Sequence, residues 1–223
     1  MAWALWVAME GGPVYGAGMN REIDWEAAYQ NAQTPWDKGV SAPILPAVFA
    51  RGVLSGRVLV PGCGRGHDAR WIAEAGGLEV VGLDLAPSAV AEATRAVAEA
   101  VRLTGKSGPA FQLGDLFALG PEWAASFDSV WEHTCFCAIS PGRRSDYVSA
   151  MAGVLRTGGI LAGVFFLNPA MDPGEEGPPF PVSIAELEGL FSGRFEKVME
   201  WAPEVSYEGR EGREWVMVWR RRG

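Results

Sequence analysis

The residues best suited to chemistry form a glycine-rich loop at 62–66, followed by an acid, Asp84, at the end of the next apolar run. The short run 57–60 predicts a buried strand that leads into the loop, and 79–83 predicts a second strand. A glycine loop between strand and helix lets the chain turn sharply and lets a ligand approach bare backbone. An acid at the tip of the next strand can bind both hydroxyls of a ribose. The pattern therefore predicts a nucleoside site.

The spacing of the glycines distinguishes between nucleotides. A dinucleotide loop has the spacing G-x-G-x-x-G and holds a pyrophosphate at the helix N-terminus. This loop has the spacing G-x-G-x-G, and Asp68 falls in the first helical turn, where its charge suits the helix dipole but would repel a pyrophosphate. The loop therefore favours S-adenosylmethionine, which has a ribose and no phosphate. A tight turn whose glycines serve only packing is the competing interpretation.

Further polar groups are expected at the ends of later strands, on the ligand side of such a sheet. Asp115 and Leu116 would lie beside the adenine, whose exocyclic amine a carboxylate can bind. His133 either faces the site or packs as a neutral histidine, and it is the best candidate for a base if one is used. Glu132 is interpreted as a cap for a neighbouring backbone amide rather than as a base.

The other histidine and the cysteines are assigned smaller roles. His67 is expected to be a structural hydrogen-bond donor, and Cys63 a buried packing residue inside the turn. Cys135 and Cys137 should line the pocket as small apolar groups, with a nucleophilic role disfavoured. No spacing typical of a metal site occurs, so no metal and no assigned catalytic residue are expected.

Three aromatic residues, Trp25, Tyr29 and Trp36, flank a Thr-Pro-Trp-Asp break ahead of the first strand. Aromatic faces attract a desolvated cation such as a sulfonium. These side chains are therefore expected to form a lid over the cofactor, with plain packing of an N-terminal helix onto the sheet as the alternative.

The bulk composition fits a single globular domain. The chain has 223 residues, of which 48% are hydrophobic and 21% charged, and its net charge of −8 argues against a nucleic-acid partner. Three cysteines indicate a reducing compartment, here the cytoplasm. No stretch is long enough to span a membrane, so no membrane partner is expected. The protein is expected to be a monomer.

Alternating patterns from 57 to 166 predict an α/β fold with a mainly parallel sheet, and two final apolar segments predict a C-terminal antiparallel hairpin. Strands are expected at 57–60, 79–83, 111–113, 127–132, 160–166, 195–201 and 214–219. Residues 1–18 are expected to be an N-terminal extension, possibly disordered. The rest, 19–223, should form one domain with a lid at about 22–50.

The chain resembles the thiopurine S-methyltransferase superfamily, and within it the halide and thiol methyltransferase branch. The resemblance covers about 25–191 and is carried by TPWDKG, VLVPGCGRGHD, VVGLDLAPSAV, GDLF, FDSVWEHTCFCAISPGRR and GPPFPVS. It implies a class I (Rossmann-like) methyltransferase fold with seven strands and S-adenosylmethionine as the donor. The cofactor-binding residues that it implies are Trp25, Tyr29, Trp36, Gly62, Gly64, Asp84, Leu85, Asp115, Leu116 and His133. Cys137 and Phe180 would line the acceptor pocket.

Several residues depart from the family pattern. His133 replaces a tyrosine, Cys135 a phenylalanine, and Phe180 stands where halide-transferring relatives often have tyrosine. The leading hypothesis is methyl transfer to a small soft nucleophile, above all a thiol. The alternatives are a halide or thiopurine methyltransferase, a dinucleotide-dependent oxidoreductase, which the glycine spacing disfavours, and a non-catalytic protein that binds S-adenosylmethionine.

Overall fold

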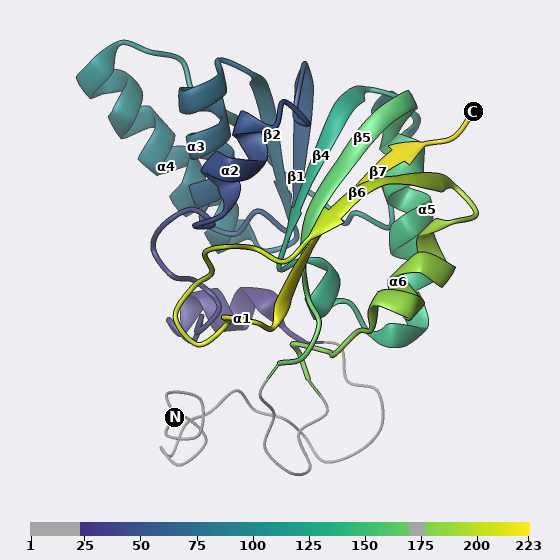
Figure 1. The fold of residues 1–223 in the computed structure, drawn as a ribbon. Coiled ribbons are helices and arrows are strands. Elements are labelled where there is room, and N and C mark those ends of the chain that lie inside the picture. The colour runs from purple at the N-terminus through teal and green to yellow at the C-terminus, as the bar shows by residue number, and fades with distance from the viewer. Residues whose placement is uncertain (1–22, 170–176) are drawn as a thin grey trace, which may run out of the picture.

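A computed structural model describes residues 23–169 and 177–223 and contains a seven-stranded sheet with the order β3-β2-β1-β4-β5-β7-β6 (Figure 1). The predicted extension at 1–18 lies outside the described residues. The strands are β1 (Arg57–Pro61), β2 (Glu79–Asp84), β3 (Ala110–Leu113), β4 (Phe127–His133), β5 (Leu155–Phe166), β6 (Phe195–Trp201) and β7 (Glu214–Arg221).

The pairing confirms the predicted mixture of directions. Strands β1 to β5 pair in parallel, and β7 pairs antiparallel with both β5 and β6. The long crossovers of the parallel part are helical, whereas β6 and β7 are joined by the short segment 202–213. The carboxyl ends of β1, β2, β3 and β4 therefore lie along one edge, where the predicted site residues follow each strand.

Helices cover both faces of the sheet (Figure 1). One face packs against α2 (Leu45–Ala50), α3 (His67–Gly76) and α4 (Pro87–Thr104), and the other against α5 (Arg144–Val154) and α6 (Ile184–Phe191). Buried aliphatic and aromatic side chains fill both layers, because strands buried on two faces must be apolar throughout. The remaining elements are α1 (Trp25–Gln30) and the 3-10 turns η1 (Pro121–Trp123), η2 (Phe136–Ala138) and η3 (Pro141–Arg143).

Strand β5 is longer than predicted. It begins at Leu155, which pairs with Phe127, whereas Ile160 pairs with Ser129, so residues 156–159 bulge out between the two pairs. Gly158 has φ +78° in this bulge. Gly158 and Gly159 therefore lie in an irregularity inside the strand.

Two helix ends are set by local conformation and by exposure. Helix α1 spans only Trp25–Gln30, and Ala32 with φ +54° lies just beyond its end. In α4, Val101 near the C-terminal end is 37% exposed.

The segment predicted to be a lid lies across the carboxyl edge. In Figure 1, α1 lies below the ends of the strands, and the 202–213 segment passes beside it. One hydrogen bond joins these two parts of the chain: the hydroxyl of Tyr207 donates to the carbonyl of Val40 at 2.7 Å. No helix among the described residues is long and apolar enough to cross a membrane.

Candidate functional site

The glycine loop turns sharply between β1 and α3. Gly62 and Gly64 have φ of +57° and +52°, a region that side chains rarely adopt. Space also excludes side chains there: a Cβ on Gly62 would lie 2.9 Å from the Sγ of Cys135, and one on Gly64 would lie 2.7 Å from the hydroxyl of Tyr29. The loop is therefore a backbone cradle with one protein wall on each side.

Asp84 holds this loop against the end of β2. Its Oδ2 accepts the Gly64 N–H at 2.7 Å, and its Oδ1 accepts the Ala86 N–H at 2.9 Å. Burial raises the pKa of Asp84 above its ordinary value, against the opposing effect of these hydrogen bonds. A carboxylate has about four acceptor positions, so two remain for the hydroxyls of a ribose. The adjacent Leu85 is 54% exposed.

The three lid aromatics form one cluster beside the loop. Trp25 and Trp36 meet edge to face with centroids 5.3 Å apart, and the Nε1 of Trp36 donates to the hydroxyl of Tyr29 at 3.4 Å. The cluster packs on Ala86 and Ala89 at the start of α4. The group packs on α4 rather than directly on the sheet, and it places Tyr29 beside the glycine loop; its contact with a cofactor stays a prediction.

An ionic network fixes the lid. Arg65, in the glycine loop, binds Asp37 at 2.6 Å and Glu92 of α4 at 2.5 Å. Arg70 donates to the Nδ1 of His67, so the proton of this imidazole lies on Nε2, which donates to Asp37. Although burial opposes it, these bonds lower the pKa of Asp37. The structural role predicted for His67 is confirmed, whereas the role of Arg65 was missed.

Glu132 lies on the side of β4 that faces α5 and is 1% exposed. It accepts the Phe136 N–H at 2.8 Å and the hydroxyl of Tyr147. Burial raises the pKa of Glu132 to about 7. The predicted cap is confirmed, and it fixes the start of η2, the turn that contains Cys137.

His133 lies at the end of the same strand and faces the opposite side. Its Nδ1 is 3.0 Å from the Oδ2 of Asp68, and its ring stacks on Tyr207 with centroids 5.7 Å apart. Asp68 also accepts the Ala42 N–H and the indole N–H of Trp131, both at 2.7 Å. The sequence analysis related Asp68 only to the helix dipole and did not predict its bond to His133.

Cys137 and Phe180 are brought together as expected. The Phe180 N–H donates to the carbonyl of Cys137 at 2.7 Å, and the buried guanidinium of Arg144 binds the carbonyl of Phe180 at 3.2 Å. Burial raises the pKa of Cys137 to about 12 and also raises that of Cys135. Both therefore remain neutral thiols near neutral pH. Cys63 is half-buried rather than buried, because the glycine turn leaves one side of it open.

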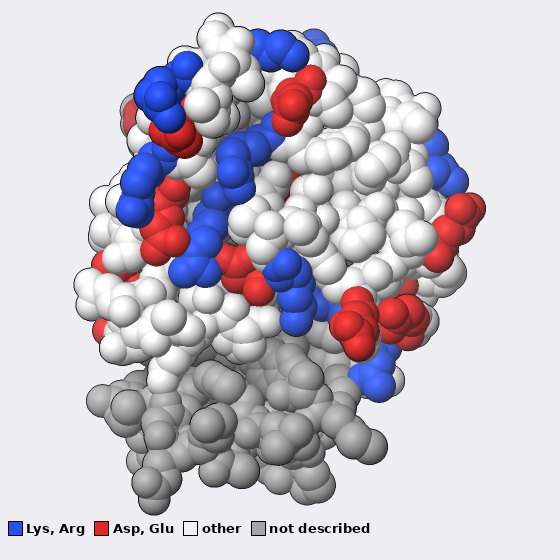
Figure 2. All heavy atoms as spheres, turned by 90° about the vertical axis from the view of Figure 1, so that its left-hand side faces the viewer, with Lys and Arg blue, Asp and Glu red and all other residues white. Residues whose placement is uncertain are grey.

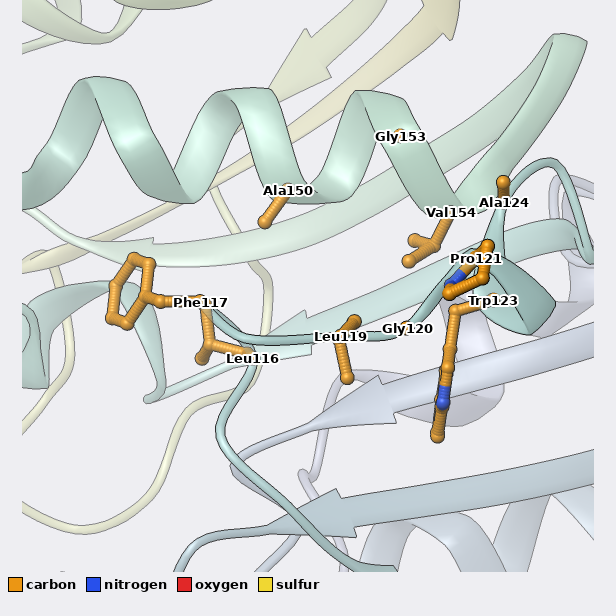
Figure 3. A pocket seen from close by; sticks show the side chains of 10 residues that line it. All are labelled: Leu116, Phe117, Leu119, Gly120, Pro121, Trp123, Ala124, Ala150, Gly153 and Val154. Carbon is orange, nitrogen blue, oxygen red and sulfur yellow. The ribbon is translucent and has the colours of Figure 1, made fainter.

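Asp115 follows β3, which pairs in register with the end of β2, and the Gly114 N–H binds the Asp84 carbonyl at 3.0 Å. Asp115 is exposed, and its Oδ1 accepts the Phe117 N–H at 2.8 Å. Leu116 borders a cavity of about 290 Å³ between this loop and α5 (Figure 3). The cavity is lined by Leu116, Phe117, Leu119, Gly120, Pro121, Trp123, Ala124, Ala150, Gly153 and Val154, so it is apolar and separate from the cradle.

Comparison with known proteins assigns the family. The model of the thiopurine S-methyltransferase (TPMT) family matches residues 20–218. The chain belongs to this family. It is 33% identical over 204 residues to "Probable thiol methyltransferase 2" of Arabidopsis thaliana, covering 91% of this chain and 86% of that one. It is 30% identical to "Thiocyanate methyltransferase 1" of Brassica oleracea, with 90% and 85% covered. A thiopurine S-methyltransferase of Pseudomonas aeruginosa is 31% identical, with 76% and 81% covered.

Solved structures agree on the fold. The structure entitled "Conversion of a Disulfide Bond into a Thioacetal Group during Echinomycin Biosynthesis" superposes with a TM-score of 0.71 at 24% identity, covering 88% of this chain and 90% of that one. Magnesium protoporphyrin IX methyltransferase from Synechocystis with bound S-adenosylmethionine gives 0.61 at 18% identity, with 91% and 86% covered. The chain has the class I methyltransferase fold and is an S-adenosylmethionine-dependent methyltransferase.

Proposed function

We propose that this enzyme transfers the methyl group of S-adenosylmethionine to the sulfur of a small thiol. The observation that carries the proposal is the cradle: a glycine loop whose Gly64 N–H binds Asp84 and whose open side meets Tyr29 of an aromatic cluster. Such a site suits a ligand with a ribose at one end and a desolvated cation at the other.

The residues proposed for the donor lie along the carboxyl edge and in the lid. Asp84 would bind the ribose, and Asp115 the adenine amine, with apolar contact from neighbouring leucines. The cluster over the loop would face the sulfonium. The full set is Trp25, Tyr29, Trp36, Gly62, Gly64, Asp84, Leu85, Asp115, Leu116 and His133, with Cys137 and Phe180 on the acceptor side.

The donor, when bound, supplies an already activated methyl group. The protein therefore contributes proximity, alignment and a dry pocket. The network of Arg65, Asp37 and Glu92 holds the lid over the loop, which supports the exclusion of water. Cys135 and Cys137 take no covalent part, because burial keeps their thiols protonated.

Sulfur is the acceptor atom that the named relatives suggest, since their names specify a thiol, thiocyanate and thiopurine. The proposed acceptor wall of Cys137 and Phe180 is apolar apart from backbone, and Phe180 has no hydroxyl. Such a wall favours a polarisable sulfur over a hydrated halide ion.

The proposal is of a small-molecule enzyme without nucleic-acid or membrane partners, working as a monomer. The net charge of −8 disfavours nucleic acid. On the face shown in Figure 2, a short diagonal run of Lys and Arg side chains is flanked by Asp and Glu side chains. Free cysteines in the described residues support the reducing cytoplasm as its compartment.

Two measurements test this function. Calorimetric titration should detect binding of S-adenosylmethionine and none of NADH, which separates a methyl donor from a dinucleotide. Incubation with the donor and ethanethiol should then yield the methyl thioether by mass spectrometry. Binding of S-adenosylmethionine without methyl transfer to any thiol would contradict the proposal and favour a non-catalytic binding protein.

A further inference from the structure

One ring nitrogen of His133 binds a carboxylate, and the other has no hydrogen-bond partner among the described residues. Its Nδ1 is 3.0 Å from a carboxylate oxygen of Asp68, which can only accept while ionised, so Nδ1 carries the proton. Among the described residues Nε2 has no partner, and it is not wholly buried. A neutral imidazole in this tautomer has its lone pair on Nε2.

Asp68 is built to stay ionised and fixed. Its side chain is 11% exposed, and the Ala42 N–H and the indole of Trp131 donate to it in addition to His133. Although burial opposes it, these three hydrogen bonds help to hold the pKa of Asp68 below its ordinary value. An ionised acceptor at Nδ1 fixes the tautomer and the orientation of the ring, which leaves the Nε2 lone pair available to take a proton.

The ring is also locked in orientation beside the proposed acceptor wall. It stacks on Tyr207, which is itself tied to Val40. The next residue, Thr134, has φ +67°, a strained conformation for a β-branched side chain and one that clusters at functional sites. The Sγ of Cys137 donates to the carbonyl of Thr134 at 3.3 Å, which places the acceptor wall next to His133.

Two other carboxylates near this edge have different roles. Glu132 faces the other side of β4, with its oxygens bound by Phe136 and Tyr147. Asp84 binds two backbone N–H groups, and its remaining acceptor positions are those proposed for the ribose. Within the described residues, the Nε2 of His133 is thus the lone pair best placed to accept a proton from an acceptor.

We propose that Asp68 and His133 form a base dyad in which His133 removes the proton of the acceptor thiol and Asp68 is a positioning residue. This rests on the proposed function. The S–H bond breaks and its proton moves to Nε2. The sulfur electron pair forms the new bond to the methyl carbon, the pair of the broken C–S⁺ bond remains on the donor sulfur, and the imidazolium releases the proton to solvent.

Acceptors that differ only in their need for a base provide the test. Ethanethiol is almost fully protonated at neutral pH, whereas para-nitrothiophenol is ionised. In His133→Asn the amide nitrogen takes the position of Nδ1 and keeps the bond to Asp68, but Nε2 is lost. We expect kcat/KM for ethanethiol to fall by about 100-fold or more, the usual contribution of a general base. With the donor at saturating concentration, the fall for para-nitrothiophenol should be at least about tenfold smaller, because any effect of His133 on the donor is common to both acceptors.

Asp68 is tested independently of activity. The chain has two histidines, and the contacts assign them opposite tautomers, Nε2–H for His67 and Nδ1–H for His133. Nitrogen-15 NMR of the ligand-free wild type should show both forms, with His133→Asn removing the Nδ1–H signals. Asp68→Asn, checked for folding by thermal melting, should shift only the His133 signals and reduce turnover of ethanethiol more than that of para-nitrothiophenol.

The possible results distinguish a failure of the proposed dyad from a failure of the proposed function. Equal losses for both acceptors in His133→Asn, no loss for either, or an Nε2–H tautomer at His133 would each overturn the dyad. Should Asp68→Asn fail to fold, the wild-type tautomer and His133→Asn still decide. A wild-type enzyme that methylates neither thiol would instead contradict the proposed function, while the NMR result would stand by itself.

Discussion

At the scale of single residues, two carboxylates of the site, Asp84 and Asp68, already accept hydrogen bonds from other parts of the protein without a ligand. Asp84 binds the glycine loop and the start of α4, and Asp68 joins α3 to β4 through Trp131 and His133. Each acid fixes the geometry of a neighbour. Substituting one therefore changes both the position of a partner and the charge at the site.

The first prediction concerns Asp84. Replacing it with alanine should weaken S-adenosylmethionine binding by roughly 10- to 150-fold, because a hydrogen bond to a charged group contributes about 1.5–3 kcal/mol. Titration calorimetry measures the change, with the exposed Glu99→Ala on α4 as the control. Because Asp84 also holds the loop, thermal melting must confirm a folded variant. Unchanged affinity would exclude Asp84 from the donor site.

The second prediction concerns Glu132, whose pKa of about 7 in the folded protein exceeds its ordinary value of 4.5. The folded state holds this proton more tightly, so the stabilisation is complete below about pH 4.5 and is lost as the pH rises through about 7. Between these values the free energy of unfolding should fall by up to about 1.4 kcal/mol per pH unit from this group.

Glu132→Gln should flatten that fall, because glutamine cannot lose a proton and still accepts from Tyr147. Urea denaturation of both proteins across this range measures it, and the exposed Glu204→Gln is the matched control. Parallel pH dependences for the wild type and Glu132→Gln would contradict a carboxyl that is neutral in the folded state.

Residue types alone predicted part of this site and missed the rest. The strand-end position of Asp84, the cap by Glu132 and the structural His67 follow from local spacing, since each lies within a turn or at a strand end. The bond between Asp68 and His133 spans 65 positions. The spacing of Trp131 and His133 places both on one face of β4, but no sequence pattern near them indicates that both bind Asp68.

At the scale of elements, the proposed lid is held in place by contacts with α4 and with the glycine loop. Helix α1 is tied to α4 through Glu26, which accepts from the hydroxyl and the N–H of Ser88. Arg65 ties the following turn to the glycine loop, and its guanidinium lies 5.3 Å from the centroid of Tyr29. That ring already has a cation nearby, so the tryptophans are the aromatic groups left for the sulfonium.

The third prediction follows from that arrangement. The product S-adenosylhomocysteine lacks the sulfonium charge, so Trp36→Leu should weaken the donor more than the product. The ratio of the two Kd values should change by up to about 30-fold, because a desolvated cation–π contact contributes about 2 kcal/mol. Trp123→Leu, in the apolar cavity away from the lid, should leave the ratio unchanged. Equal weakening of both ligands by Trp36→Leu would make the cluster simple packing.

Element types were predictable where the pattern was long, and their ends were not. The parallel strands and α6 with its Ser183 cap follow from apolar runs and capping residues. The Ser183 hydroxyl accepts the Glu186 N–H at 3.1 Å, while the Glu186 carboxylate binds Arg144 at 2.6 Å. The bulge in β5 and the short α1 depend on register and positive φ, which apolar periodicity does not encode.

At the scale of the whole molecule, segments from both ends of the described chain close over one edge of the sheet. Tyr207 stacks on His133 and binds Val40, a contact between residues 167 positions apart. The mainly parallel sheet with its terminal hairpin was predictable from the order of elements. The meeting of the lid with the 202–213 segment was not, because it arises only once the sheet is assembled.

The fourth prediction concerns the boundary of the domain. We expect that deleting residues 1–18 leaves the melting temperature and methyl transfer nearly unchanged, because the described lid begins to pack at Trp25. Thermal melting and a transfer assay on the shortened protein measure both quantities. A large loss of either would show that this segment contributes to the core or to closing the site.

The choice of acceptor tests the central claim most directly. Ethanethiol, iodide and a thiopurine should be supplied together with S-adenosylmethionine bearing a deuterated methyl group, and each methylated product quantified by mass spectrometry. The account predicts that the label accumulates chiefly on the sulfur of ethanethiol, with kcat/KM for the thiol exceeding that for iodide. Preferential labelling of iodide, or no labelled thioether at all, would contradict a thiol methyltransferase.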